Sequence, residues 1–332
     1  MIKLGATASS LAITLFGLVV VTFFIGRVIP IDPVIAILGD HARPELVERL
    51  RAELALDQPL TTQFWLYLGK LAHGDLGRSV MTSNPVLDDI RLYFPATVEL
   101  GTTAMILSTL VGVPLGVISA VRRNSRIDQV ARVVSLFGHS LPIPVLGLVS
   151  LLLFYAWLGW SPGTGRVGVA YVGLIPAVTG FLTVDALIAG DLEVFWDALA
   201  HLILPAAVLA YFSMAYISRM TRAFMIEALS GEYVITARAK GLSAARVIWR
   251  HAFGNIAVRL VTVLALTYAG LLEGAVVTEM IFSWPGIGQY LTVSLMNADM
   301  NAVIGATLVV GSVYMVMNML ADIVYRVLDP RV

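Results

Sequence analysis

The chain has 332 residues, of which 58% are hydrophobic and only 13% charged, and its mean hydropathy is +0.85. A soluble domain needs more polar surface than this, so the composition predicts a membrane protein that crosses the bilayer several times. The 22 basic and 22 acidic residues balance, and the absence of cysteine excludes disulfides and thiolate metal sites. The five histidines form no HxxxH or HxH pair, which argues against a metal site.

Six apolar runs are long enough to cross a bilayer core, which takes about 20 helical residues. The first run has no small-residue cleavage site and closes at Arg27–Pro30, so we expect a retained span rather than a signal peptide. The fifth run is interrupted by Glu273 and Glu279. In chain order the runs are Leu4–Gly26, Leu100–Val121, Val133–Tyr155, Ala198–Ser218, Ile256–Ile281 and Met300–Ala321.

The outer loop of about residues 29–94 is too long to be a simple connection. Pro44–Leu54 carries apolar residues at helical spacing, and a second apolar-faced segment covers Gln63–Leu71. Together they predict a small helical cap on the outer surface.

A further uncharged run, Val167–Val184, is ambiguous, because its hydropathy alone would allow it to span. Counting it would place region 219–259 outside, although that region has seven basic residues against two acidic ones. Basic residues favour the cytoplasmic side, and the 122–132 loop carries four arginines against Asp128. Pro176 and the neighbouring glycines also make a poor helix. We therefore predict an outer loop here, six spans, and both termini in the cytoplasm.

The segment Glu232–Ser243 sets a compact, basic helix and turn between two apolar runs. Glu232 at the start of the helix and Arg238 and Lys240 near its end suit the helix dipole. Gly241 can adopt the left-handed conformation that ends a helix. Some thirty residues of internal loop suggest that a partner docks there.

A second short helix is predicted over Ala244–Phe253, with Ser243 able to cap it. Ala237, Ala239 and Gly241 would leave a small-residue surface into which a partner fits closely. The alternative is an ordinary basic loop that binds lipid headgroups, and the residues alone do not decide between the two.

This segment resembles the cytoplasmic "EAA" loop of ATP-binding-cassette importer permeases, in the form found in dipeptide, oligopeptide and nickel permeases. That form reads ARAKGL followed by a His-Ala…Asn element, which here are Ala237–Leu242, His251-Ala252 and Asn255. Further matches are spaced along nearly the whole chain: Leu56–Pro59, Gly74–Gly77, Pro95–Leu100, Gly112–Gly116, Ser140–Pro142, His201–Pro205, Phe282–Gly288 and Leu328–Arg331. The resemblance implies an all-α, polytopic fold of the type I importer permeases, with six transmembrane helices and a helical outer-loop cap.

The resemblance also implies a division of the chain. It comprises a first transmembrane helix over 1–28, an extracytoplasmic loop over 29–94 and a core permease domain with five helices over 95–327, which contains a coupling loop over 222–256. In the family the equivalent of 228–253 supplies the coupling helix, which sits in a cleft on an ATPase subunit. The implied coupling residues are Glu232, Tyr233, Ala237, Arg238, Ala239, Lys240, Gly241, Leu242 and Ser243.

By this resemblance the chain is a multi-pass subunit of the cytoplasmic (inner) membrane that imports dipeptides or oligopeptides by alternating access. Its implied partners are a paralogous permease, two ATP-binding subunits, an extracytoplasmic solute-binding protein and membrane lipid, with no nucleic acid. No GxxxxGK[ST] phosphate loop occurs, so ATP and Mg²⁺ are expected on the partners, and the chain alone is expected to be neither an enzyme nor a cofactor carrier. Nickel, glutathione or oligosaccharides are alternative solutes.

Carboxylates in the hydrocarbon region are costly and usually face a cavity or a partner. Glu273 is therefore a candidate for the translocation path, although an acid that reaches water at the outer interface is the alternative. Glu279 resembles the family's usual acid near the outer end, and a structural role is expected. His139 and Pro142 lie where the third run is broken and are further path candidates, with a structural kink as the alternative.

Asp75, Asn297 and Asp299 are expected in outer loops and are candidates for contact with the binding protein. Two positions depart from the family pattern. The usual Pro-Gly-Asp-Pro is Pro30–Pro33 here, with Ile31 for glycine, and Arg259 replaces a proline.

Two other classes of protein remain as alternatives. A proton-driven secondary transporter would need ionisable residues in several spans and an inverted repeat. A membrane-anchored scaffold would need neither the small-residue coupling segment nor a broken third helix.

Overall fold

The computed structural model describes residues 2–28, 34, 43–53 and 56–328. The Pro30–Pro33 motif and Asp329–Arg331 lie outside this part. The described residues are helical apart from turns, loops and one isolated bridge between Arg78 and Pro85, which confirms the all-α prediction. The chain divides into two compact units, the first of Met1–Pro95 and Gly286–Met315 and the second of Ala96–Pro285 and Val316–Val332.

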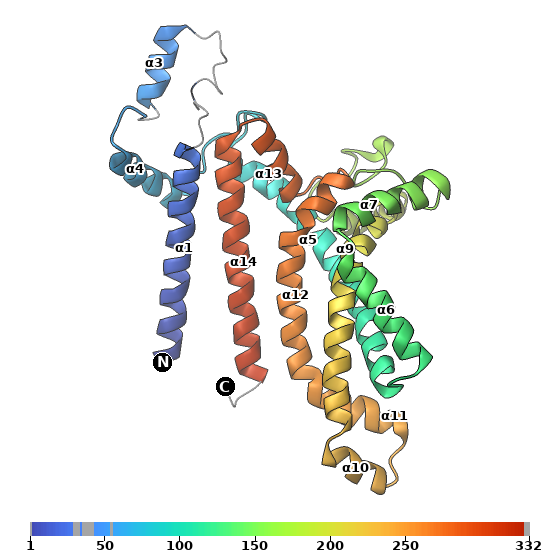
Figure 1. The fold of residues 1–332 in the computed structure, drawn as a ribbon. Coiled ribbons are helices and arrows are strands. Elements are labelled where there is room, and N and C mark those ends of the chain that lie inside the picture. Colours follow the sequence, from blue (N-terminus) through green and yellow to red (C-terminus); the bar gives the residue numbers. More distant parts are fainter. Residues whose placement is uncertain (1, 29–33, 35–42, 54–55, 329–332) are drawn as a thin grey trace. The chain divides into compact units, whose positions relative to one another are not determined.

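The first unit combines the N-terminal part of the chain with the segment Gly286–Met315 (Figure 1). Its core gathers side chains from the start of α5 with side chains from α13 and α14. The two segments predicted in the outer loop are confirmed as helices, α3 and α4. The unit contains α1 (Ile2–Val28), α3 (Pro44–Glu53), α4 (Leu60–Ala72), the start of α5 (Val86–Val121), α13 (Ile287–Met296) and the first part of α14 (Met300–Leu328).

Helices α1 and α14 run antiparallel and close together within this unit. Gly26 of α1 faces Ile304 of α14, and Gly311 of α14 faces Leu18 of α1. A glycine at each point lets the neighbouring side chain approach the backbone, as is common between membrane helices. Helix α4 packs on α1 through the ring of Phe64, whose centroid lies 5.1 Å from that of Phe23.

The second unit is built around α9, the most buried of its long helices. Its central core joins α5, α9 and α12 with Trp284, through Ala96, Leu100, Ala104, Leu202, Ala206, Leu209, Ala210, Leu271 and Ala275. In chain order the elements after α5 are α6 (Arg126–Ser140), α7 (Ile143–Ser150), a π-helix (Leu151–Trp157), a 3₁₀ turn (Val169–Tyr171), α8 (Leu182–Ala189), α9 (Leu192–Leu229), α10 (Glu232–Ala239), α11 (Ala244–Arg246), a second π-helix (Val247–Phe253) and α12 (Gly254–Ile281).

Four described helical segments are long and apolar enough to cross a membrane: Val86–Val121, Leu192–Leu229, Ala244–Ile281 and Met300–Leu320. Helices α6 and α7, bent by more than 40° where Pro142 and Pro144 interrupt the run, would make a fifth span. A shorter apolar helix covers Ala12–Gly26 in α1. The count of six spans stays a prediction, whereas the prediction that Val167–Val184 is no spanning helix is confirmed.

The helices extend further than the apolar runs that predicted them. α5 starts at Val86 rather than near Leu100, because Val86 and Ile90 are buried in the core of the first unit. α9 starts at Leu192, where the Asp191 carboxylate accepts hydrogen bonds from two free N–H groups of the first turn. Hydropathy marks the part of a helix that suits a bilayer, and its ends depend on caps and packing.

Gly116 of α5 provides a test of this packing, because a Cβ there would lie 2.6 Å from the Ser218 carbonyl oxygen of α9 and from the Thr221 Cβ. We expect Gly116→Ala to lower the free energy of unfolding by about 1–3 kcal/mol. Gly69→Ala in α4 is the matched control, since nothing lies within 4 Å of its added Cβ. Thermal unfolding of the purified protein measures both, and equal midpoints would contradict the close α5–α9 crossing.

Candidate functional site

The predicted coupling segment folds as a helical hairpin at one end of the second unit (Figure 1). α9 ends at Leu229, and α10 begins at Glu232 after a short turn. α11 and the second π-helix follow the hairpin turn and continue without a break into α12. The hairpin is therefore attached to two membrane helices, at both of its ends.

The turn has the backbone conformation that the sequence predicted. Gly241 has φ +76°, and its N–H donates to the Arg238 carbonyl at 2.9 Å. The Leu242 N–H reaches back to the Ala237 carbonyl at 3.3 Å, which completes a glycine-terminated helix end. The second helix starts directly after Ser243, but the Ser243 side chain makes no capping hydrogen bond.

Inside the hairpin a small apolar core holds the two helices together. Val234, Ala237 and Val247 are buried in it, and Leu242 packs against them. This corrects one detail of the expected docking surface, because Ala237 faces the hairpin core rather than a partner. Ala239 and Gly241 are exposed as predicted.

The exposed face of the hairpin combines apolar and basic side chains. Ile235 is 66% exposed and Tyr233 is 39% exposed, although both are hydrophobic residues of an ordered helix. Arg238 and Lys240 lie exposed on the same short helix and its end. Apolar side chains held outward beside charges are typical of a surface that a protein partner covers.

The hairpin is anchored to the ends of α5, α9 and α12. Arg259 of α12 forms an ion pair with Glu227 of α9 at 2.8 Å, and its guanidinium lies over the Phe224 ring. The residue that departs from the family pattern thus ties α12 to α9. A buried cluster beneath the hairpin joins Val117, Ala120, Met225, Ala228, Ala252 and Ile256.

The two carboxylates of α12 have different environments. Glu279 is fully buried and accepts a 2.6 Å hydrogen bond from the Thr97 hydroxyl of α5, as a structural group would. Glu273 is exposed and has no ion pair or hydrogen bond among the described residues. An unpartnered carboxylate on a membrane helix normally faces water or another subunit.

Sequence reasoning missed a buried acid in another membrane helix, Glu99 of α5. Its carboxylate accepts two hydrogen bonds from the Arg166 guanidinium, one of them from Nε at 3.1 Å. It also accepts a hydrogen bond of 2.6 Å from the Thr183 hydroxyl. The available signal was a carboxylate at the edge of an apolar run together with Arg166, the single basic residue in an otherwise acidic outer loop.

The remaining candidates lie apart from the hairpin. Asp75 and Asn297 are exposed in the first unit. Asp299 is fully buried there and accepts hydrogen bonds from the Ser79 hydroxyl and the Met81 N–H, so it supports a turn in this structure rather than presenting a contact surface.

At the break of the third run, Pro142 is the exposed N-cap residue of α7. The His139 side chain lies outside the described residues. No group of three His, Asp or Glu side chains in the described ranges is arranged to hold a metal ion.

The loop before α8, which is predicted to lie on the outer side, depends on Asp185, a residue outside the membrane-spanning helices. Its buried carboxylate accepts hydrogen bonds from the N–H groups of Val178, Thr179 and Gly180 and from the Thr179 hydroxyl. Burial alone would raise the pKa of this carboxyl, but the hydrogen bonds outweigh it and hold the pKa below its ordinary value of 3.8.

A lowered folded-state pKa stabilises the fold above the ordinary value and loses that effect as pH falls through the folded-state value. We expect the loop to loosen below pH 3.8 in the wild type, with a fall in protection of its amides from hydrogen exchange. Asp185→Asn should lose protection already at neutral pH. Asp57→Asn, at an exposed position, is the control, and identical profiles for the two variants would refute the role of Asp185.

Comparison with known proteins covers almost the entire chain. Residues 112–332 match the family described as "Binding-protein-dependent transport system inner membrane component", and residues 4–101 match the N-terminal region of such membrane components. The chain is 42% identical to the probable D,D-dipeptide transport system permease protein DdpB of Escherichia coli (strain K12), over 97% of this chain and 94% of that protein.

Two further relatives have similar names. The di/tripeptide transport system permease protein DppB of Pseudomonas aeruginosa (strain UCBPP-PA14) is 42% identical over 96% of this chain and 95% of its own length. The dipeptide transport system permease protein DppB of Escherichia coli (strain K12) is 41% identical over the same shares. With matches of this extent, the chain belongs to the inner membrane components of binding-protein-dependent transport systems, as a DppB-like permease of the ATP-binding-cassette importers.

Proposed function

We propose that this permease imports dipeptides across the cytoplasmic membrane, and that the exposed face of the α10 hairpin receives the force that drives transport. The observation that carries the proposal is the outward position of Tyr233 and Ile235 on a hairpin with its own buried core. A folded support that holds apolar side chains in water favours a docking surface for a partner protein. The proposed partner at this hairpin is an ATP-binding subunit. A second ATP-binding subunit would dock on a paralogous permease.

In this proposal the chain itself binds neither ATP nor Mg²⁺. Closure of the ATP-binding subunits moves the hairpin, and the hairpin moves α9 and α12, to which it is joined. The transmembrane helices then alternate between inward-open and outward-open states. An extracytoplasmic binding protein delivers the solute, with exposed Asp75 and Asn297 as candidate contacts, and both termini lie in the cytoplasm.

The exposed face of α12 is the proposed side of the translocation path. Of the 18-residue apolar stretch within Ala244–Ile281, only 28% is buried, whereas 56% of the corresponding stretch of α9 is buried. Gly270 and Gly274 on this helix have nothing within 4 Å of an added Cβ, and Glu273 lies between them. Open space beside small residues and a free carboxylate favours a face that meets a second permease or the solute.

Ala239 is the sharpest probe of docking, because it is exposed and does not belong to the apolar core of the hairpin. We expect Ala239→Trp to reduce uptake by more than about tenfold through steric obstruction of the docked partner. Ala239→Ser, which adds one small atom, should retain most of the uptake. Transport by the purified complex in proteoliposomes measures both variants.

Membrane insertion and thermal unfolding of the same variants should be unchanged. Gly241 is a less direct probe, since any side chain at φ +76° strains the backbone by about 1–2 kcal/mol irrespective of docking. Normal ATP-driven uptake by Ala239→Trp would contradict docking at this face. Uptake that continues without ATP would favour a secondary transporter.

The solute can be tested by competition in the same proteoliposomes. We expect unlabelled dipeptides to compete with uptake of a labelled dipeptide, whereas nickel, glutathione and oligosaccharides should not. Glu273→Gln should change the apparent affinity or turnover, with Glu279→Gln as a buried comparison whose effect appears in thermal stability. Competition by nickel or glutathione alone would replace the dipeptide assignment, and wild-type kinetics in Glu273→Gln would remove that residue from the path.

A further inference from the structure

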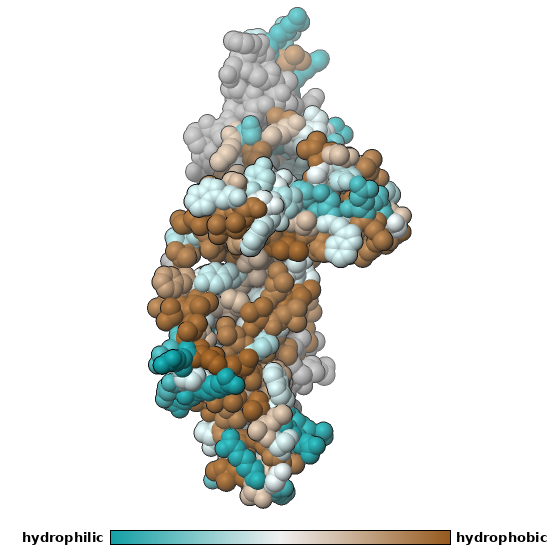
Figure 2. Space-filling view, turned by 90° about the vertical axis from the view of Figure 1, so that its right-hand side faces the viewer, coloured by the Kyte–Doolittle hydropathy of each residue, from teal (hydrophilic) through white to brown (hydrophobic). Residues whose placement is uncertain are grey.

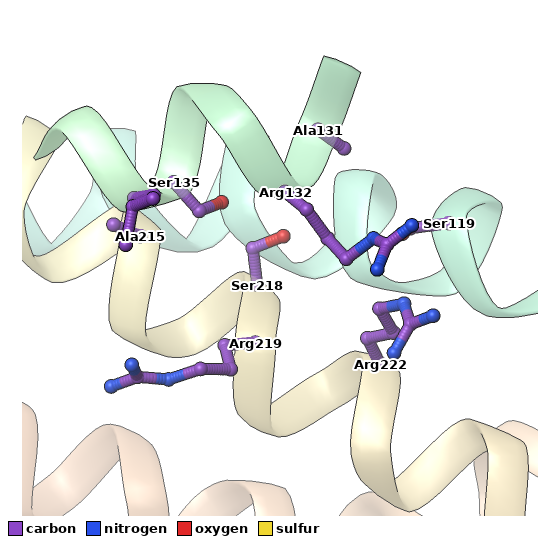
Figure 3. A pocket seen from close by; sticks show the side chains of 9 residues that line it. Ser119, Ala131, Arg132, Ser135, Ala215, Ser218, Arg219 and Arg222 are labelled. Atoms are coloured by element: carbon purple, nitrogen blue, oxygen red, sulfur yellow. The ribbon is translucent and has the colours of Figure 1, made fainter. Parts of the chain in front are cut away.

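A basic cavity lies between α6 and α9 (Figure 3). Its volume is about 280 Å³. Three arginines and three serines provide its polar lining: Arg132, Arg219, Arg222, Ser119, Ser135 and Ser218. Figure 3 shows Arg132 of α6 and Arg222 of α9 at one end of the cavity and Arg219 extending toward the other.

The arginines outnumber the carboxylates at this cavity. Asp128 accepts two hydrogen bonds from Arg222, at 2.7 and 2.9 Å, and lies 3.8 Å from the Arg132 Nε. Arg219 has no ion pair among the described residues, and its guanidinium lies over the Tyr216 ring. Three guanidinium groups against one carboxylate leave a surplus of two positive charges, which an anion would neutralise.

The cavity lies where the apolar parts of two helices end. The uncharged stretch of α9 stops at Ser218, directly before Arg219, and that of α6 begins directly after Arg132. Arginines in this position mark the boundary between the hydrocarbon core and water. Figure 2 shows that hydrophobic side chains cover the middle of the visible face and that hydrophilic ones gather toward its lower end.

The α6 surface beside the cavity is apolar and unusually exposed. Leu136, which lines the cavity, is 67% exposed, and Phe137 and Val133 are 59% and 51% exposed. A ligand that contacts both regions needs an anionic group for the arginines and hydrocarbon for α6. A free anion would use only the first of these.

We propose that this cavity binds the phosphate of an anionic phospholipid headgroup and that the acyl chains of the lipid lie along α6. Guanidinium groups bind phosphate oxygens with directed, charge-assisted hydrogen bonds, and the hydroxyls of Ser135 and Ser218 add further donors, whereas the Ser119 hydroxyl donates to Asp128. Basic pockets between membrane helices recognise anionic headgroups in this way. The volume is slightly below the roughly 300–1,000 Å³ of small-molecule sites, which suits a headgroup rather than a whole lipid. The leaflet follows from the proposed orientation of the chain, but the chemistry of the site does not depend on it.

The test measures lipid retention by the full transport complex, purified from membranes that contain phosphatidylglycerol and phosphatidylcholine. Native mass spectrometry counts the lipids that stay bound. We expect wild-type complex to retain phosphatidylglycerol in preference to phosphatidylcholine, and Arg132→Gln with Arg219→Gln to reduce that retention by about tenfold. Arg222 is left intact, because it holds Asp128 in place.

The matched control is the pair Arg123→Gln with Arg126→Gln, which removes the same charge from the α5–α6 loop and the first residue of α6 but does not alter the cavity lining. Equal losses in the two pairs would overturn the site, as would equal retention of the two lipids by the wild type. Displacement of the lipid by millimolar inorganic phosphate would assign the cavity to the free ion instead. Binding to the isolated chain but not to the complex would assign it to a protein contact.

Arg219→Gln alone guards against misfolding of the double variant, since Arg219 has no described ion pair to lose. A normal thermal midpoint with reduced phosphatidylglycerol retention in this single variant supports the site, and unchanged retention opposes it. Lipid retention is independent of uptake, so the result stands whether or not the proposed dipeptide transport is correct.

Discussion

The second unit depends on the hydrogen bonds around the turn of α5 that starts at Ala96. The Trp284 indole N–H donates to the Ala96 carbonyl at 2.9 Å, and Thr97 donates to Glu279 of α12. In the same turn, Glu99 forms an ion pair with Arg166 of the loop that precedes α8. Polar groups buried in an apolar interior must find partners within the protein, because no water is present to replace them. This single turn therefore fixes the positions of α12, the residues after it and the outer loop.

The hairpin, in contrast, keeps part of its apolar surface exposed. Val234, Ala237 and Val247 are directed inward, where they form a small apolar core. Its larger apolar side chain, Ile235, is directed outward. Arg238 and Lys240 are exposed on the same short helix and its end, so the hairpin offers both charge and an apolar side chain to a partner.

The sequence predicted features that depend on local chemistry. Apolar runs located the helices, Gly241 identified the hairpin turn, and prolines identified the break between α6 and α7. It did not predict which side chains meet across long distances in the chain. Glu99 and Arg166 are 67 residues apart, and nothing in either local pattern names the other. The burial of Ala237 and Asp299 was missed for the same reason, since small or acidic residues suit both a surface and a filled interior.

One feature of the hairpin affects how motion would pass through the molecule. From Ala244 to Ile281 the backbone is helical without a break, across 38 residues and one π-helical stretch. A flexible connection would absorb a displacement of its inner end as slack. A continuous helix resists both bending and torsion, so the same displacement must reappear as tilt or axial rotation further along. Glu273 belongs to this continuous helix. The direction in which its carboxylate points is therefore mechanically linked to the position of Ala244, about thirty residues earlier.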